Sequence, residues 1–230
     1  MNQQAFINRV RSRLGRSGAD GIPQWTPSLP IPDAGPTDPE ALVERYQAEL
    51  AKLSGESYRV ASEAEVAPLV VRILKEAGAS GPVARWDDPV LNGLGLDEAL
   101  TDAGYPVTPL RHGEPGRPQV ELVEKAAAGI TGADFAIAET GTLVMGSSRP
   151  GDAAASGRGR TVSLLPPIHI AVVQKEQFVY TAAQVFRQLR QMGVLPSQVI
   201  FASGPSRSAD IENDLSIGVH GPGQVHVIII

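Results

Sequence analysis

Short runs of hydrophobic residues alternate along the chain with segments whose hydrophobic residues recur every three or four positions. The recurring pattern is typical of amphipathic helices, and the short runs are typical of buried strands. Helices are expected in residues 2–14, 38–53, 62–78, 96–103, 119–128 and 181–192. Apolar runs occur in residues 58–60, 82–86, 105–110, 133–138, 142–145, 162–173, 199–202 and 225–230, and Pro166 and Pro167 break the run at 162–173. This alternation predicts an α/β fold, a three-layer sandwich with a mainly parallel central sheet.

Several residues mark where these helices begin and end. Asp38 fits a carboxylate cap, and Pro39 suits the first helical position. Residues 62–65 fit a capping box, but Pro68 is awkward inside a helix and favours a start a few residues later. Gly129 is expected to end the helix that precedes it.

The first part of the chain differs from the rest. Residues 2–14 fit a short helix, and residues 17–37 hold five prolines, which is typical of an extended linker. Residues 1–37 are therefore predicted to be a helical arm with a Pro-rich linker, and residues 38–230 to be one domain. We expect the arm to dock on this protein or on a partner.

Composition narrows the classes of function. The 230 residues are 42% hydrophobic, which suffices for a sizeable core, and the net charge of -5 argues against nucleic-acid binding. The absence of cysteine excludes disulfides, cysteine nucleophiles and cysteine-ligated zinc or iron–sulfur clusters. No apolar run is long enough to span a membrane, and residues 1–14 lack the apolar block of a signal peptide, so we expect a cytoplasmic protein.

The segment from Ser203 to Asp210 is a candidate anion site. Its hydroxyls, its backbone N–H groups around Gly204 and the Arg207 guanidinium all suit a phosphate or carboxylate. A loop that only caps a helix would have the same composition, and the two interpretations have similar weight. Because Asp210 and Glu212 would repel an anion, they are expected to accept hydrogen bonds from a ligand or from Arg207.

A second candidate is the corner formed by Glu139, Thr140, Gly141 and Thr142 between two apolar runs. The carboxylate is suited to act as a base, a nucleophile or a hydrogen-bond acceptor. A plain hairpin turn is the alternative, and glycine in the corner favours it. We expect this corner to lie beside the Ser203 loop, at the carboxyl end of the parallel sheet.

The four histidines differ in context. His226 lies in an apolar strand and is expected to be a satisfied core residue, whereas His220 lies in a glycine-rich loop and is a candidate for catalysis. His169 follows a Pro-Pro pair. The histidine spacing does not suggest a metal site, and none is predicted. Arg158 and Arg160, in a glycine-rich loop, are suited to close over an anion or simply to aid solubility.

Four segments occur in an order that resembles the LUD-domain family over roughly residues 40–230. They are residues 129–142, 164–173, 203–212 and 218–222. The resemblance implies a fold of the NagB/RpiA/CoA-transferase-like type. It also implies a role beside an iron–sulfur protein and a second subunit in the oxidation of L-lactate to pyruvate. Larger relatives carry ferredoxin-like cysteine clusters that this chain lacks, so any electron carrier is expected on a partner.

The residues that match the family pattern are the candidate site residues. Glu139 and His220 are the candidates for catalysis. The candidates for ligand binding are Thr140, Gly141, Thr142, His169, Ser203, Gly204, Ser206, Arg207, Asp210 and Glu212.

Three functions remain open from the sequence. The leading one is a component of an L-lactate-oxidising system that carries no cofactor itself and binds a small anionic or nucleotide-like ligand. The second is a free-standing enzyme similar to CoA transferases or folate cyclo-ligases, with Glu139 as acyl acceptor. The third is a scaffold whose arm docks partners. Homo-oligomerisation is left open.

Overall fold

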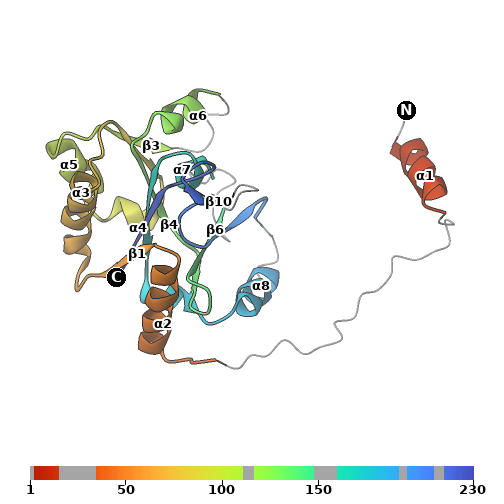
Figure 1. The fold of residues 1–230 in the computed structure, drawn as a ribbon, viewed down its shortest axis with the longest axis horizontal. Helices are drawn as coiled ribbons and strands as arrows, with labels where there is room; N and C mark the ends of the chain where they lie inside the picture. Colours follow the sequence, from red (N-terminus) through yellow and green to blue (C-terminus); the bar gives the residue numbers. More distant parts are fainter. Residues whose placement is uncertain (1–2, 16–34, 111–116, 148–159, 192–195, 210–214) are drawn as a thin grey trace. The chain divides into compact units, whose positions relative to one another are not determined.

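The computed structural model describes residues 3–15, 35–110, 117–147, 160–191, 196–209 and 215–230 (Figure 1). The chain divides into two units, residues 1–32 and residues 33–230. The larger unit contains all the strands and is described first.

The larger unit is built around six parallel strands in the order β1-β12-β7-β4-β2-β3. The strands are β1 (Glu56–Arg59), β12 (Gln224–Ile229), β7 (Ile168–Val173), β4 (Ala128–Gly132), β2 (Val83–Trp86) and β3 (Val107–Leu110). Every residue of β7, β4 and β2 is buried, because a parallel sheet is covered on both faces. The expected α/β fold with a mainly parallel central sheet is confirmed.

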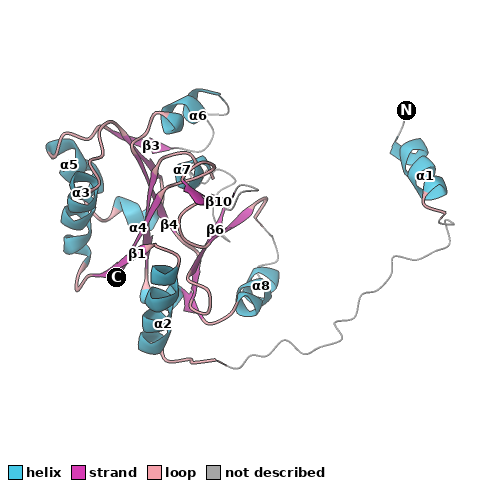
Figure 2. Ribbon diagram, viewed as in Figure 1, coloured by secondary structure: helices cyan, strands magenta, loops and turns pink. Residues whose placement is uncertain are grey.

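A second sheet has four strands in the order β8-β5-β6-β9. They are β8 (Phe178–Val179), β5 (Phe135–Ile137), β6 (Thr142–Gly146) and β9 (Val199–Ala202). Side chains alternate along β6, so Leu143 and Met145 pack into the core shared with the parallel sheet. Val144 packs on the other side, against Val185 and Leu189 of α8 (Ala182–Gln191). The second sheet is therefore a layer between the parallel sheet and α8 (Figure 2).

Helices complete the layers. In Figure 1, α3 (Val66–Glu76) and α5 (Leu96–Asp102) lie on the side of the parallel sheet opposite β6 and α8. Near β2 and β4 are α6 (Arg117–Glu124) and α7 (Thr161–Leu164), while α2 (Pro39–Lys52) packs against β1 and β8. The remaining elements are the short helices α4 (Pro89–Asn92), η1 (Glu63–Glu65) and η2 (Lys175–Gln177), and the hairpin of β10 (Arg207–Ala209) with β11 (Leu215–Ile217).

The prediction of a helix over residues 119–128 is wrong for the second half of that range. The helix α6 ends at Glu124, and residues 128–132 form the buried strand β4. Gly129 therefore does not end a helix. It lies where α7 crosses the sheet, and a Cβ on Gly129 would overlap the carbonyl oxygen of Val162. A glycine at this position permits the close approach of two backbones.

The predicted cap of α2 is confirmed, whereas the predicted capping box before α3 is wrong. The Asp38 carboxylate caps α2 by accepting a hydrogen bond from the Ala41 N–H at 2.9 Å. The capping box at residues 62–65 is not formed as expected, because Ser62 makes no side-chain cap bond and the residues after it form the 3-10 turn η1. The helix α3 then begins at Val66, so Pro68 lies in its first turn, where a missing N–H is tolerated.

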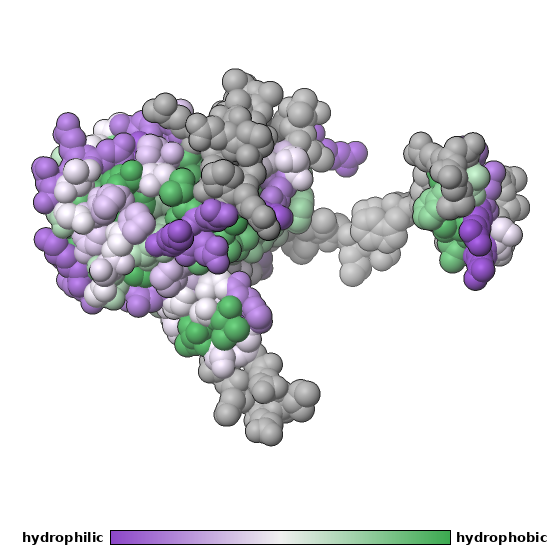
Figure 3. Space-filling view, turned by 90° about the horizontal axis from the view of Figure 1, so that it is seen from above, coloured by the Kyte–Doolittle hydropathy of each residue, from purple (hydrophilic) through white to green (hydrophobic). Residues whose placement is uncertain are grey.

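The smaller unit contains the helix α1 (Gln3–Arg13), which agrees with the helix expected over residues 2–14. Phe6, Val10 and Leu14 are exposed, and Figure 3 shows hydrophobic and hydrophilic residues of this helix gathered on different sides. Residues 16–34 lie outside the described residues, so the division at residue 37 stays a prediction.

Candidate functional site

The two polar loops that the sequence singles out lie side by side. The strands β6 and β9 are antiparallel neighbours with Leu143 opposite Ala202, which brings Thr142 next to Ser203. The hydroxyl oxygens of Thr142 and Ser203 are 2.7 Å apart, and those of Thr140 and Thr142 are also 2.7 Å apart. These three residues form a hydrogen-bonded row, which we call the hydroxyl row.

The last turn of α2 supports both loops. Gly141 has a φ of 63°, and a Cβ placed on it would lie 2.6 Å from the backbone nitrogen of Leu50. Gly204 has a φ of 77°, and a Cβ there would lie 2.9 Å from the Cβ of Leu53. Glycine is needed at each corner because the loop both turns with positive φ and presses on the helix.

Arg207 joins its loop to the same end of α2. Its Nη2 donates a hydrogen bond of 2.8 Å to the hydroxyl of Ser54, the residue that follows Leu53. A cation in this position is favourable, because the carboxyl end of a helix carries partial negative charge. The guanidinium has five N–H donors, so this bond does not use up its capacity to hold an anion. Asp210 and Glu212, the other expected partners, lie outside the described residues.

A third loop lies against the Ser203 loop. The backbone N–H of Ser206 donates to the carbonyl of Pro222 at 2.8 Å, and the N–H of Gly218 donates to the carbonyl of Ser206 at 2.9 Å. His220 lies in this loop and is exposed. The structure therefore brings the loops of Thr142, Ser203 and His220 together.

These loops lie at the amino-terminal edge of the parallel sheet, so the expected carboxyl-terminal position is wrong. Ser54, the partner of Arg207, precedes the first residue of β1, and Pro222, the partner of Ser206, precedes the first residue of β12. The cause is the second sheet: the apolar runs beside the corner belong to that sheet and not to the parallel one.

Glu139 lies at the tip of a hairpin between β5 and β6, which was the alternative interpretation of that corner. Its backbone N–H donates to the carbonyl of Tyr180 at 3.0 Å, and its side chain is exposed. The carboxylate is therefore accessible from solvent, on the residue directly before Thr140 of the hydroxyl row.

His169 is placed apart from the loops. It is 1% exposed in the middle of the parallel sheet, where its Nε2 lies 2.8 Å from the Thr131 hydroxyl, and that hydroxyl is 3.6 Å from the Met145 sulfur. Burial, with a smaller effect from His226, lowers the pKa of His169 to about 4. His226 is also buried, and its Nδ1 lies 3.3 Å from the Tyr58 hydroxyl, which agrees with a satisfied core histidine.

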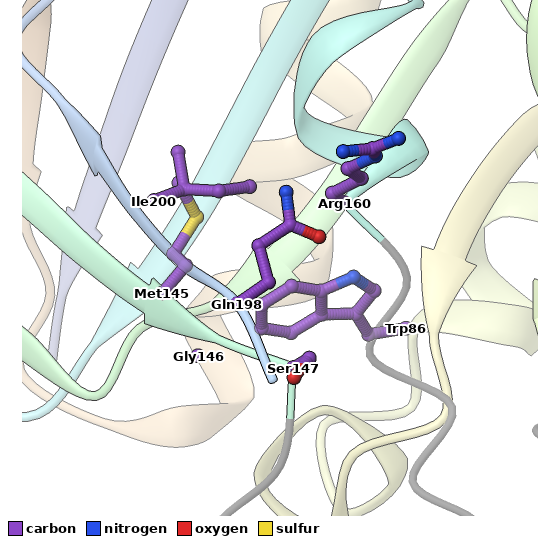
Figure 4. A pocket seen from close by; sticks show the side chains of 7 residues that line it. All are labelled: Trp86, Met145, Gly146, Ser147, Arg160, Gln198 and Ile200. Carbon is purple, nitrogen blue, oxygen red and sulfur yellow. The ribbon is translucent and has the colours of Figure 1, made fainter. Parts of the chain in front are cut away.

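A cavity that the sequence did not suggest lies at the other edge of the sheet (Figure 4). It is small, with room for about one water molecule. The residues that line it are Trp86, Met145, Gly146, Ser147, Arg160, Gln198 and Ile200. Only Arg160 was a candidate from the sequence, as a residue that could close over an anion. Gln198 carries no motif, and Trp86 reads only as the end of a strand, so no sequence signal linked them.

The described residues contain neither a metal-binding cluster nor a membrane-spanning helix. No group of three or more His, Asp or Glu residues is arranged to hold a metal ion within the described ranges. Among the helices of those same ranges, none is both long and apolar enough to cross a membrane.

Comparison with known proteins identifies relatives over most of the chain. The LUD domain model matches residues 43–230. Lactate utilization protein C of Bacillus subtilis (strain 168) is 33% identical, with 100% of this chain and 96% of that protein covered. Its counterpart from Geobacillus sp. (strain WCH70) is 31% identical, with 100% and 95% covered. A crystal structure of a DUF162 family protein from Deinococcus radiodurans has a TM-score of 0.57 at 21% identity, covering 84% of this chain and 99% of that one. The last likeness supports the fold alone.

Proposed function

Because the chain belongs to the LUD domain family, we propose that it is a component of a system that oxidises L-lactate to pyruvate. The observation that carries this proposal is the similarity to proteins named lactate utilization protein C, which extends over 95% or more of each of two relatives. Similarity over the full length supports transfer of the role to the whole chain and not to one motif.

The proposed reaction requires an electron acceptor. Conversion of the lactate alcohol to the pyruvate ketone releases two electrons and two protons, and no atom of the carbon skeleton is lost. This chain has no cysteine, so it offers no thiolate ligands for an iron–sulfur cluster. We therefore assign the electron-carrying clusters to partner subunits.

The three loops are the proposed ligand site of this subunit. The hydroxyl row supplies hydrogen-bond donors and acceptors, and Arg207 supplies a positive charge near it. Such groups suit a small anion or a phosphate of a nucleotide-like ligand. We assign proton transfer there to Glu139 and His220, whose side chains are exposed.

The second candidate function is a free-standing enzyme similar to CoA transferases or folate cyclo-ligases. The exposure of Glu139 favours it, since an acyl-accepting carboxylate must be reachable by a bulky thioester. In that enzyme the Glu139 carboxylate would attack the acyl carbon and the CoA thiolate would leave.

Deletion of the gene for this chain tests the main proposal. The deletion strain is expected to lose growth on L-lactate and to keep growth on pyruvate, and the wild-type gene should restore growth on L-lactate. Purification of the tagged protein from lactate-grown cells is expected to recover iron–sulfur subunits, recognised by their visible absorbance and iron content. Unchanged lactate oxidation in extracts of the deletion strain would rule the proposal out.

A further inference from the structure

The strand β9 has one open edge in the described part of the chain. It is an outer strand of the second sheet, and its other edge pairs with β6. Every residue of β6 is buried, whereas no residue of β9 is. Figure 1 shows β9, in blue, on the outer side of β6. An open edge presents backbone N–H and C=O groups that can pair with a strand of another chain.

The other outer strands of the two larger sheets carry features that discourage such pairing. Charged side chains, proline and short length are the usual protections of a strand edge. The strand β1 begins with Glu56 and ends with Arg59, β3 contains Pro109, and β8 has only two residues. The four residues of β9, Val199–Ala202, include neither a charge nor a proline. Among the outer strands of these described sheets, β9 is therefore the one best suited to pair with another chain.

Two exposed aromatic side chains lie beside this edge. Phe201 of β9 is 39% exposed, and Phe186 of α8 is 59% exposed. Their rings stack with centroids 5.5 Å apart and planes inclined by 28°. Large apolar side chains that are grouped at a surface mark interaction sites, whereas single ones do not. The open edge and the aromatic pair thus belong to one contact surface.

We infer that β9 pairs in antiparallel fashion with β9 of a second copy of this chain. The two second sheets then form one continuous sheet to which each copy contributes four strands. A two-fold axis perpendicular to the sheet makes identical strands antiparallel, which is also the relation between β9 and β6. Residues 196–206 contain no charged side chain, so the axis brings no like charges face to face along the paired strands. The edge is therefore complementary to itself.

The backbone of β9 is oriented for this pairing. The Ser147 N–H donates to the Gln198 carbonyl at 2.9 Å, and the register makes these two residues a directly opposed pair. Because backbone groups point alternately to the two sides of a strand, those of Ile200 also face β6. The N–H and C=O groups of Val199 and Phe201 then face the open edge. A second strand can bond to all of them.

The position of the axis follows from the faces of the sheet. Phe201 stacks on α8, and Val199 packs against the cluster that includes α8, so both point to the α8 face. Opposed residues of antiparallel strands share a face, so the axis passes through a residue and not between two residues. The registers that pair most of β9 place the axis at Ile200 or at Phe201. In both, the stacked phenylalanines of the two copies meet on one side of the sheet.

This pairing also reaches the proposed ligand site. Ser203 of the hydroxyl row directly follows Ala202, the last residue of β9. With the axis at Phe201, Val199 of the second copy lies opposite Ser203. The second copy then borders the loop that carries the hydroxyl row. The inference itself does not depend on what that loop binds.

Measurement of the mass in solution tests the inference. The contact is small, so we expect a dissociation constant on the order of micromolar, as in transient interfaces. Analytical ultracentrifugation across the micromolar range should show a mass that rises from 24.2 kDa toward twice that value. Phe201→Asp places like charges at the axis and should weaken the dimer at least about tenfold. The matched control is Leu122→Asp on α6, another exposed apolar position, which should dimerise as the wild type does.

Cysteine crosslinking locates the contact. The chain has no cysteine, so each single-cysteine variant reports on one position. Directly opposed residues of an antiparallel pair have Cα atoms about 4.5–5.5 Å apart, which suits a disulfide. Of Ile200→Cys and Phe201→Cys, the variant at the axis should form a disulfide-linked dimer much faster than Leu122→Cys, the control. The faster of the two identifies the register.

Two results would overturn the inference. One is a wild-type protein that stays monomeric throughout the micromolar range, with no preferential crosslink at either position of β9. The open edge would then serve a strand of a different protein or none. The other is a dimer that persists in Phe201→Asp and crosslinks at neither position, since this would place the contact on another surface. Both results leave the deletion phenotype on lactate as a separate test of the proposed function.

Discussion

Thr142 and Ser203 are 61 positions apart in the sequence, and their hydroxyl oxygens are 2.7 Å apart in the structure. Thr142 is 4% exposed and also contacts the Thr140 hydroxyl, so it is the middle member of the hydroxyl row. The Glu139 corner and the Ser203 loop are thus joined by side chains as well as by the β6–β9 pairing. Loss of this link should loosen one loop from the other.

Thr142→Val is expected to lower the free energy of unfolding by about 1 kcal/mol, the net value of a typical hydrogen bond. Valine keeps the shape of threonine, and the exposed Ser203 hydroxyl can bond to water instead. Chemical denaturation measures the change. In a double-mutant cycle with Ser203→Ala, we expect a coupling of at least about 0.5 kcal/mol. Strict additivity of the two substitutions would contradict a direct link.

Gly129→Ala is expected to destabilise the domain by about 1–3 kcal/mol or more, because the added methyl group must displace the Val162 carbonyl. Thermal unfolding measures the loss. Gly93→Ala is the matched control, since its φ is -78° and its new Cβ would meet neighbours at ordinary distances of 3.8 Å or more. That variant should be neutral or slightly stabilised. Equal melting temperatures for the two variants would show that the backbone of α7 moves at little cost to accommodate the added methyl group.

His169 should make stability depend on pH. Its pKa is about 4 in the folded protein and about 6.5 when unfolded, so between these values the unfolded state binds more protons. Its contribution to the free energy of unfolding is fully present above about pH 6.5 and is lost as the pH falls toward 4. The upper limit of this contribution is on the order of 3 kcal/mol. Urea denaturation from pH 4 to 7 measures the slope.

His169→Gln removes the titrating group, and the slope over that range should become shallower. Some slope will remain, because burial also lowers the pKa of His226. An unchanged slope in His169→Gln would mean that His169 is not the source.

Arg207→Ala separates a ligand role from a structural role. If the loops bind an anion, the affinity should fall at least about tenfold, since charge-assisted bonds are worth about 1.5–3 kcal/mol each. Arg207→Lys should recover only part of the affinity. The stability should change little, because an exposed arginine bonded to Ser54 contributes little to the core. A lower melting temperature with unchanged affinity would indicate that Arg207 only holds its loop against α2.

Local signals in the sequence predicted many elements correctly. The capping of α2 by Asp38 and the fit of Pro68 in the first turn of α3 depend only on neighbouring residues. The error at residues 119–128 has a tertiary cause. Ala128 and Gly129 lack the bulk that marks a strand, and their small size serves the close crossing of α7.

The candidate site was predicted in part. The sequence indicated that the Thr142 and Ser203 loops are neighbours, and their hydrogen bond agrees with this. It placed them at the wrong edge, since apolar runs do not reveal which of two sheets a strand joins. Trp86, Gln198 and Arg160 come from three distant segments without a shared motif, so only the folded chain shows that they line one cavity.

The pairing of β1 with β12 has a consequence for how the protein matures. Tyr58 and His226 are 168 positions apart, and β12 is the only strand that pairs with β1 in the described sheet. During synthesis, β1 and the helix α2 before it emerge from the ribosome long before β12 does. Nearly the whole domain must follow before β1 can pair. A nascent chain paused before β12 would carry an unpaired strand edge, which is prone to aggregation. Expression levels should therefore respond to chaperone supply more than the melting temperature of the finished protein would suggest.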